Sequence, residues 1–169
     1  MLVRAMVWGC EIQLVEPNSN PLKNVNEEFD FVAMVSLQVQ ASLEDEKSLE
    51  KLRSIKSLII GGAPISTKLK SDLAKNGIKA WQTFGMTETV SHIALAEIRS
   101  DELLYHVLSG VEIGQDSKGA LWIKSEMSGP DPIQTNDLIE LQSETSFIWL
   151  GRADYVVNSG GIKLFPELI

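Results

Sequence analysis

Residues 81–92 of this chain read Trp-Gln-Thr-Phe-Gly-Met-Thr-Glu-Thr-Val-Ser-His. An apolar, strand-like run ends there at Gly85, and hydroxyl and carboxylate side chains follow at once. In an open α/β protein, ligands bind in the crevice outside the carboxyl ends of the parallel strands. Thr87 and Glu88 are therefore the first candidates for a functional site. The alternative is a polar turn after a strand, in which Gly85 serves only the turn.

The segments before this stretch alternate between strand-like and helix-like patterns. Phe31–Val35 and Ser57–Ile60 are short apolar runs typical of buried strands, and residues 36–55 between them have apolar positions at helical spacing. Ser66 is a candidate helix N-cap and Gly77 a candidate helix stop. The order strand, helix, strand predicts a parallel sheet with crossover helices.

The first fifteen residues are mostly apolar. Met1–Cys10 has no cap residue or polar first turn, so we expect a core helix whose beginning lies upstream. Its apolar run, Ala5–Trp8, is too short for an export signal. Glu11–Val15 alternates polar and apolar residues, and we expect a short strand there.

The pattern changes after His92, because short strand candidates follow one another without a helical period between them. We expect an antiparallel sheet or small antiparallel β-barrel after the parallel part, with Trp122 and Trp149 in its core. The strand candidates are Ile93–Ile98, Val111–Ile113, Ala120–Lys124, Asp137–Leu141 and Ser146–Leu150.

Composition excludes several classes of protein. The 169 residues are 44% hydrophobic and 22% charged, which is ordinary for a globular domain, and their net charge is -8. A negative chain without a basic cluster argues against a nucleic-acid binder. No stretch approaches the roughly 20 apolar residues of a membrane span. Cys10 is the single cysteine, so we expect no internal disulfide or cysteine-based zinc site and a reducing, cytoplasmic location. Oligomeric state is left open.

Four separated stretches match one family in order and spacing. They are Gly61–Pro64, Phe84–Thr89, Thr135–Asp137, and Gly151–Asp154 followed by Asn158–Pro166. Together they resemble the motifs of the adenylate-forming enzymes, the acyl-CoA synthetase superfamily. The amino-acid sequences of residues 85–94, 135–141 and 158–166 look most like those of the o-succinylbenzoate-CoA ligases of menaquinone biosynthesis.

The resemblance implies a partial adenylate-forming fold. Residues 1–92 would be part of an N-terminal α/β nucleotide-binding subdomain, and residues 93–153 an antiparallel β subdomain of the same domain. Residues 154–169 would form the hinge, at Asp154, and the truncated start of a mobile C-terminal domain. Such enzymes join a carboxylic acid to the α-phosphate of ATP and then transfer the acyl group from AMP to coenzyme A.

The resemblance also implies a role for each matching residue. Glu88 would help hold Mg²⁺, a hard cation that prefers oxygen ligands, and Thr87 would bind phosphate. Asp137 would accept hydrogen bonds from the ribose hydroxyls, which Arg152 would also reach. The alternative for Asp137 is an aspartate that serves only a turn or the start of a strand, and the alternative for Arg152 is a surface salt bridge. The adenine would lie between Gly62, Ala63 and Pro64 on one side and Thr83, Phe84 and Gly85 on the other.

Two further assignments depend on position alone. Ser91 and His92 follow the nucleotide motif and are candidates for contact with the acyl substrate, although a histidine at a strand start is commonly structural. Gly160 and Gly161 would approach the pantetheine tunnel of coenzyme A, and a plain β-turn is the competing explanation.

Two parts of the family pattern do not occur in the chain. The Ser/Thr/Gly-rich phosphate loop should lie upstream of residue 1, and the catalytic lysine beyond Ile169. We therefore expect the chain alone to be inactive as a ligase. The competing functions are another acyl-CoA ligase, for a fatty or aromatic acid, and a noncatalytic scaffold of the same fold.

Overall fold

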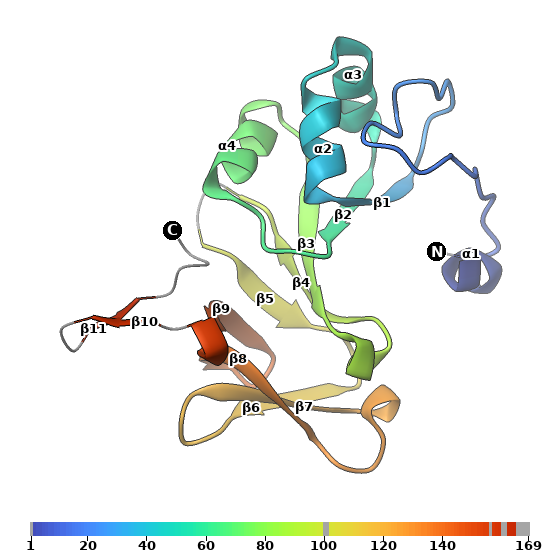
Figure 1. Ribbon diagram of the computed structural model, residues 1–169. Helices are drawn as coiled ribbons and strands as arrows, with labels where there is room; N and C mark the ends of the chain where they lie inside the picture. Colours follow the sequence, from blue (N-terminus) through green and yellow to red (C-terminus); the bar gives the residue numbers. More distant parts are fainter. Residues whose placement is uncertain (1, 100–101, 156, 160–161, 165–169) are drawn as a thin grey trace. The chain divides into compact units, whose positions relative to one another are not determined.

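The computed structural model describes residues 2–99, 102–155, 157–159 and 162–164 (Figure 1). The chain divides into two units, residues 1–80 and 81–169, which are described in turn. The expected subdomain boundaries concern a longer protein and remain a prediction.

The first unit contains a parallel strand pair. β1 (Phe31–Val35) pairs with β2 (Ser57–Gly61), from Phe31 opposite Ser57 to Val35 opposite Gly61. The chain crosses between them through α2 (Ser36–Leu43) and α3 (Glu46–Ser54), as Figure 1 shows. A parallel pair needs such a crossover. The predicted parallel strands and crossover helices are therefore confirmed.

Side chains and backbone close the ends of the helices in this unit. The Asp45 carboxylate accepts a hydrogen bond from the Ser48 N–H at 3.0 Å at the start of α3, and this bond lowers the pKa of Asp45. Ser66 Oγ likewise accepts from the Leu69 N–H at 3.2 Å at the start of α4 (Thr67–Lys75).

The end of α4 is a Schellman motif. The Ile78 N–H donates to the Leu73 carbonyl and the Gly77 N–H to the Ala74 carbonyl, each at 3.0 Å, with Gly77 at φ +68°. Leu73 and Ile78 are both buried. The predicted N-cap and helix stop are confirmed.

The N-terminal segment differs from its prediction. α1 (Leu2–Trp8) is a helix, but none of its residues is buried, so it is not a core helix within the described unit. Trp8 meets Phe31 edge-on at 5.9 Å between ring centroids. The strand expected over Glu11–Val15 is wrong, because these residues pair with no described strand and are all exposed. None of the described helices combines the length and hydrophobicity that crossing a membrane requires.

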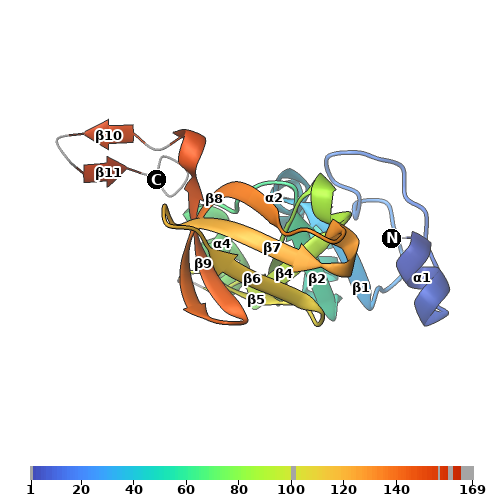
Figure 2. The same ribbon diagram turned by 90° about the horizontal axis from the view of Figure 1, so that it is seen from below.

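The second unit is an antiparallel sheet. Its strands are β3 (Ala80–Gly85), β4 (His92–Glu97), β5 (Leu104–Val107), β6 (Val111–Gln115), β7 (Ala120–Ser125), β8 (Ile133–Ser143) and β9 (Ser146–Arg152). They lie in the order β3-β4-β5-β9-β8-β7-β6. Figure 2 shows β7, β8 and β9 of this sheet from below. All five strands predicted after His92 are present, and β5 is additional. The described ladder stays open rather than closing into a barrel. Two short strands, β10 (Val157–Ser159) and β11 (Ile162–Leu164), pair separately.

An aromatic cluster fills the core of this sheet. Phe147 is fully buried, and the Tyr105 ring stacks on it at 5.3 Å between centroids while Phe84 meets it edge-on at 5.2 Å. Burial raises the pKa of Tyr105.

Trp122 and Trp149, predicted in the core, are only half-buried. Trp149 packs against the core cluster. Trp122 lies opposite Gly114, where an added Cβ would come within 2.4 Å of the indole ring.

Candidate functional site

Two predicted ribose contacts lie side by side on neighbouring strands. Asp137 on β8 is paired in register with Arg152 on β9. The Asp137 carboxylate is 10% exposed, and its Oδ2 lies 3.8 Å from Arg152 Nη1, which is too long for a hydrogen bond. Within the described part of the chain, Oδ2 accepts no hydrogen bond. One carboxylate oxygen of a buried residue, beside a cation, is thus left available to a hydroxyl donor.

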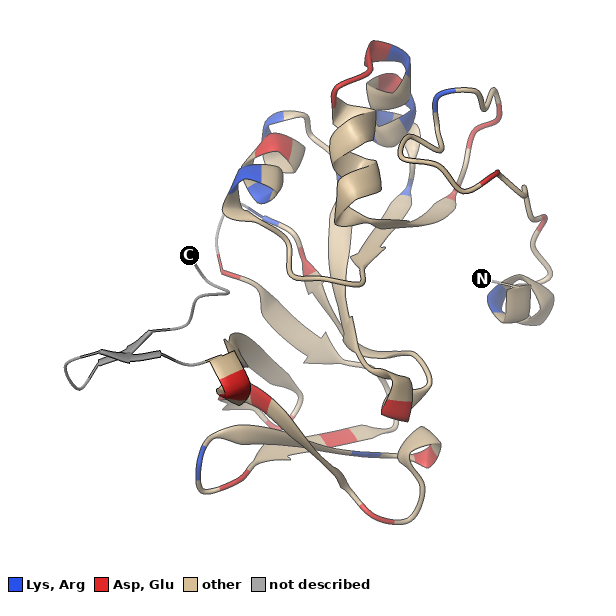
Figure 3. Ribbon diagram, viewed as in Figure 1, with Lys and Arg blue, Asp and Glu red and all other residues tan. Residues whose placement is uncertain are grey.

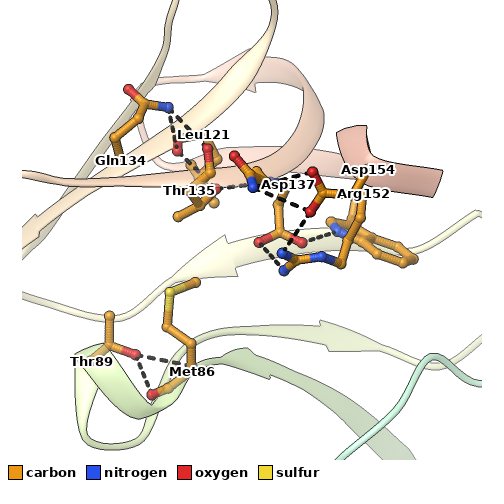
Figure 4. Close-up of polar contacts among 10 residues, drawn as sticks. Met86, Thr89, Leu121, Gln134, Thr135, Asp137, Arg152 and Asp154 are labelled. Atoms are coloured by element: carbon orange, nitrogen blue, oxygen red, sulfur yellow. Dashed lines mark hydrogen bonds and ion pairs between the residues drawn. The ribbon is translucent and has the colours of Figure 1, made fainter. Parts of the chain in front are cut away.

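The other carboxylate oxygen is already bonded. Trp149 Nε1–H donates to Asp137 Oδ1 at 2.9 Å (Figure 4). The ladder shifts register between Leu138 and Ile139, so that Trp149 stands opposite Ile139, diagonal to Asp137 on the same face. This irregularity in β8 and β9 brings the indole to the carboxylate. The sequence prediction missed Trp149 as a polar contact.

The backbone of Asp137 is fixed as well. Its N–H donates to Thr135 Oγ1 at 3.0 Å, and the Thr135 hydroxyl donates to the Leu121 carbonyl on β7 at 2.9 Å. Thr135 and Asp137 are both buried. Three strands therefore hold this carboxylate in place.

Asp154, the predicted hinge, joins the same group of side chains. It lies in the single turn η3 (Ala153–Tyr155), and its Oδ2 is 3.2 Å from Arg152 Nη2. Asn136 Nδ2 donates to the two oxygens of Asp154 at 3.3 and 3.2 Å. The hydrogen bond to Asp154, followed in effect by the nearby charge of Asp137, raises the pKa of Arg152. Arg152 is shared between two carboxylates.

Thr87 and Glu88 lie on η1 (Thr87–Thr89), a single turn after β3, and both side chains are exposed. The third residue, Thr89, is fully buried and fixes the turn. Its Oγ1 accepts from the Met86 N–H at 3.1 Å and lies 3.0 and 2.8 Å from the carbonyl oxygens of Met86 and Ser91, as Figure 4 shows for Met86. Thr89 was not among the predicted site residues.

The turn is bounded by two unusual backbone positions. Gly85 leaves no room for a side chain, because an added Cβ would lie 2.4 Å from His92 Cα and 2.6 Å from the Ser91 carbonyl oxygen. Val90 has φ +63° and ψ −40°, and the Ser91 N–H reaches the Thr89 carbonyl at 2.6 Å across it. This is a strained γ-turn for a β-branched residue. Strain of this kind is concentrated at functional sites.

A second turn repeats the design of η1. η2 (Glu126–Ser128) follows β7 and lies beside η1, and Ser128 Oγ bonds the N–H and carbonyl of Ser125, both at 2.8 Å. Each turn carries an acidic residue, coloured red in Figure 3: Glu88 on η1 and Glu126 on η2. Among the described residues, no group of three or more His, Cys, Asp or Glu side chains could hold a metal ion.

The remaining predicted site residues fall into separate places. Ser91 Oγ lies 3.4 Å from His92 Nδ1 at the start of β4. Thr83 is half-buried in β3, and Phe84 has its ring in the aromatic cluster. Gly62, Ala63 and Pro64 form the exposed turn after β2, in the first unit. Gly160 and Gly161 lie outside the described residues.

Comparison with known proteins gives a consistent set of relatives, although no family model matches the chain. A protein named probable 2-succinylbenzoate–CoA ligase from Mycobacterium tuberculosis is 28% identical over 158 residues, which cover 88% of this chain and 41% of that protein. The 2-succinylbenzoate–CoA ligase of Enterococcus faecalis is 20% identical, over 98% of this chain and 41% of its own length. The chain thus spans less than half of the curated relatives it matches.

Solved structures agree with these relatives. An AMP-forming acyl-CoA synthetase-like protein from Dyadobacter fermentans superposes with a TM-score of 0.76 at 39% identity, over 89% of this chain and 43% of that one. The o-succinylbenzoate coenzyme A synthetase of Bacillus subtilis, solved with ATP and magnesium, gives a TM-score of 0.64 at 21% identity, over 80% and 34%. The latter likeness shows the fold alone.

Proposed function

We propose that this chain, whose homologues and structural neighbours are AMP-forming acyl-CoA synthetases including 2-succinylbenzoate–CoA ligase, is part of an ATP-dependent acid–CoA ligase. The whole protein would adenylate o-succinylbenzoate with ATP and pass the acyl group to coenzyme A, in the cytoplasm. The specific acid is inferred from the relatives' names and from the amino-acid sequences of residues 85–94, 135–141 and 158–166.

The observation that carries this proposal is the arrangement around Asp137. A ribose presents two adjacent hydroxyl donors, and the largely buried Asp137 side chain offers one carboxylate oxygen without a described hydrogen bond, beside the Arg152 guanidinium. Charge-assisted bonds to a carboxylate are stronger than neutral ones, and low exposure strengthens them further. Asp137 and Arg152 would bind the sugar of ATP and of the acyl-adenylate.

The turn after β3 would handle the phosphates. Thr87 would donate its hydroxyl to a phosphate oxygen, and Glu88 would bind the Mg²⁺ that accompanies ATP. Joining an acid to the α-phosphate brings two anions together, so the reaction depends on cationic stabilisation and positioning. The exposed Thr87 and Glu88 side chains on a rigid turn suit this role.

The substrate and coenzyme would approach from residues near these. Ser91 and His92 would hydrogen-bond a carboxylate of o-succinylbenzoate. Asp154 would be the hinge between the two halves of the reaction, and Gly160 and Gly161 would line the path of coenzyme A. Adenine would contact Gly62, Ala63 and Pro64, and the Thr83–Gly85 strand end.

Titration calorimetry of this chain with AMP tests the nucleotide-binding part of the proposal. We expect weak but saturable binding that Asp137→Asn reduces, and GMP serves as the control for adenine recognition. Absence of AMP binding would contradict a preformed nucleotide pocket in the chain.

A ligase assay tests the reaction. We expect no thioester from this chain with ATP, Mg²⁺, coenzyme A and o-succinylbenzoate, because the phosphate loop and the lysine of the family do not occur in it. The whole parent protein, assayed in the same way, should form o-succinylbenzoyl-CoA. Benzoate and a fatty acid are tested as competing substrates. A preference for either would replace the proposed acid, and an open reading frame without the loop and lysine would favour the scaffold alternative.

A further inference from the structure

We propose that Trp149 is a positioning residue that fixes the Asp137 carboxylate so that a single oxygen, Oδ2, receives the ribose. This inference rests on the proposed role of Asp137 in binding the sugar of the nucleotide.

The indole hydrogen bond has a defined direction. An indole N–H is a donor only, so Trp149 Nε1 donates and Asp137 Oδ1 accepts at 2.9 Å. The acceptor belongs to the largely buried Asp137 side chain. The guanidinium of Arg152 is also nearby, with its Nη1 3.8 Å from Asp137 Oδ2. Trp149 therefore supplies the one hydrogen bond to this side chain in the described part of the chain.

Packing alone does not account for the tryptophan. Its ring lies half-buried against the core cluster, where a phenylalanine would cover much of the same apolar surface. The indole N–H reaches Asp137 only because the register shifts between Leu138 and Ile139. A carboxylate held at one oxygen has lost its freedom to rotate about χ2, which lowers the entropy cost of binding a ligand at the other.

Occupation of Oδ1 also makes the carboxylate asymmetric toward a diol. Because Oδ2 alone would accept from the ribose, one of the two adjacent hydroxyls would bond to it more strongly than the other. The 2′- and 3′-hydroxyls should then contribute unequally to affinity, and the inequality should shrink when the indole N–H is removed.

The experiment uses the 169-residue chain labelled with ¹⁵N at its four tryptophans, each of which gives one indole N–H signal. Trp149→Phe removes the hydrogen bond and keeps an aromatic ring. Trp122→Phe is the matched control, because Trp122 is a half-buried tryptophan of the same sheet that packs on Gly114. Binding is measured with AMP, 2′-deoxyAMP and 3′-deoxyAMP.

We expect Trp149→Phe to weaken AMP binding by about five- to tenfold, and Trp122→Phe by less than about twofold. In the unmodified chain, the Trp149 indole signal should move on addition of AMP and also in Asp137→Asn without ligand. The two deoxynucleotides should differ in affinity by about threefold or more, and by less in Trp149→Phe.

Two results would overturn the inference. One is an indole N–H signal of Trp149 that has the same position in Asp137→Asn as in the unmodified chain. This measurement needs neither a nucleotide nor a folded Trp149 variant. The other is AMP binding that Asp137→Asn weakens while Trp149→Phe and Trp122→Phe behave alike. If AMP does not bind at all, the proposed function fails for this chain, and the ligand-free comparison still decides whether the indole holds the carboxylate.

Discussion

The two parts of the candidate site are built in opposite ways. Asp137 and Arg152 are paired across β8 and β9, and their side chains contact each other and further side chains. Thr87 and Glu88 are exposed on η1, and the buried Thr89 hydroxyl fixes the turn beneath them. The strand part fixes its candidate side chains directly, whereas the turn part fixes only the backbone and leaves its candidate side chains, Thr87 and Glu88, exposed to solvent. In the turn part, substitutions that change stability and substitutions that change binding should therefore fall at different residues. In the strand part, one substitution can change both.

Gly85→Ala tests the frame of the turn. The new Cβ would meet the backbone of Ser91 and His92 at 2.4 to 2.9 Å, so we expect a loss of about 3 kcal/mol or more in the free energy of unfolding. Urea denaturation followed by circular dichroism measures it. Gly77→Ala is the control, because Gly77 has open space around it and only the left-handed helical φ of +68° to strain, at about 1 kcal/mol. Equal losses would show that Gly85 is needed only for turn conformation.

Thr89→Val tests the buried hydroxyl. Valine keeps the shape but leaves the Met86 N–H without its acceptor, so we expect a loss of about 2 kcal/mol in unfolding free energy. Thr87→Val, two residues earlier in the same turn but exposed, should change stability by less than about 0.5 kcal/mol. If the two valine variants are equally stable, Thr89 does not hold the turn.

Asp137→Asn and Glu88→Gln compare binding in the two parts. Without magnesium, we expect Asp137→Asn to weaken AMP binding by about tenfold, equivalent to about 1.4 kcal/mol, because a charged acceptor becomes neutral. Glu88→Gln should leave AMP affinity within about twofold and reduce only the effect of Mg²⁺ on ATP binding. Calorimetric titration measures both. An equal loss of AMP affinity would remove the distinction between a sugar-binding and a metal-binding part.

Val90→Gly tests the strain at the end of the turn. Glycine adopts φ +63° without steric cost, and relief of the valine should outweigh its extra chain entropy, giving a gain of about 1 kcal/mol in unfolding free energy. Val35→Gly is the matched control, since Val35 is also an exposed valine but has φ −94° in β1, and it should lose about 1 kcal/mol. Thermal unfolding of both variants decides the sign.

The sequence predicted the elements better than the contacts. Helical spacing and short apolar runs located α2, α3 and the strands on either side, because these signals are local. Leu104–Val107 was missed as a strand because four residues carry little pattern. Glu11–Val15 had the alternation of a strand, but a strand also needs a paired neighbour, which a local pattern does not reveal.

The site shows the same limit. Asp137, Arg152 and Asp154 were identified by resemblance, and the structure brings these three together. The Trp149 bond was not predictable, because it depends on the register shift between Leu138 and Ile139, which sequence periodicity does not show. Thr89 was within the motif, but its burial beneath two exposed neighbours is a tertiary property. A hydroxyl four residues after the end of β3 was the one available signal.

The packing of Trp122 on Gly114 has a consequence for how this protein can vary. The indole occupies the volume that any side chain at position 114 would need. Position 114 can therefore gain a methyl group only if the Trp122 ring moves or position 122 becomes smaller, and a smaller residue at 122 leaves Gly114 without its covering ring. The two positions are therefore expected to be energetically coupled: each single substitution should lower the free energy of unfolding, and the double substitution should lower it by less than the sum of the two.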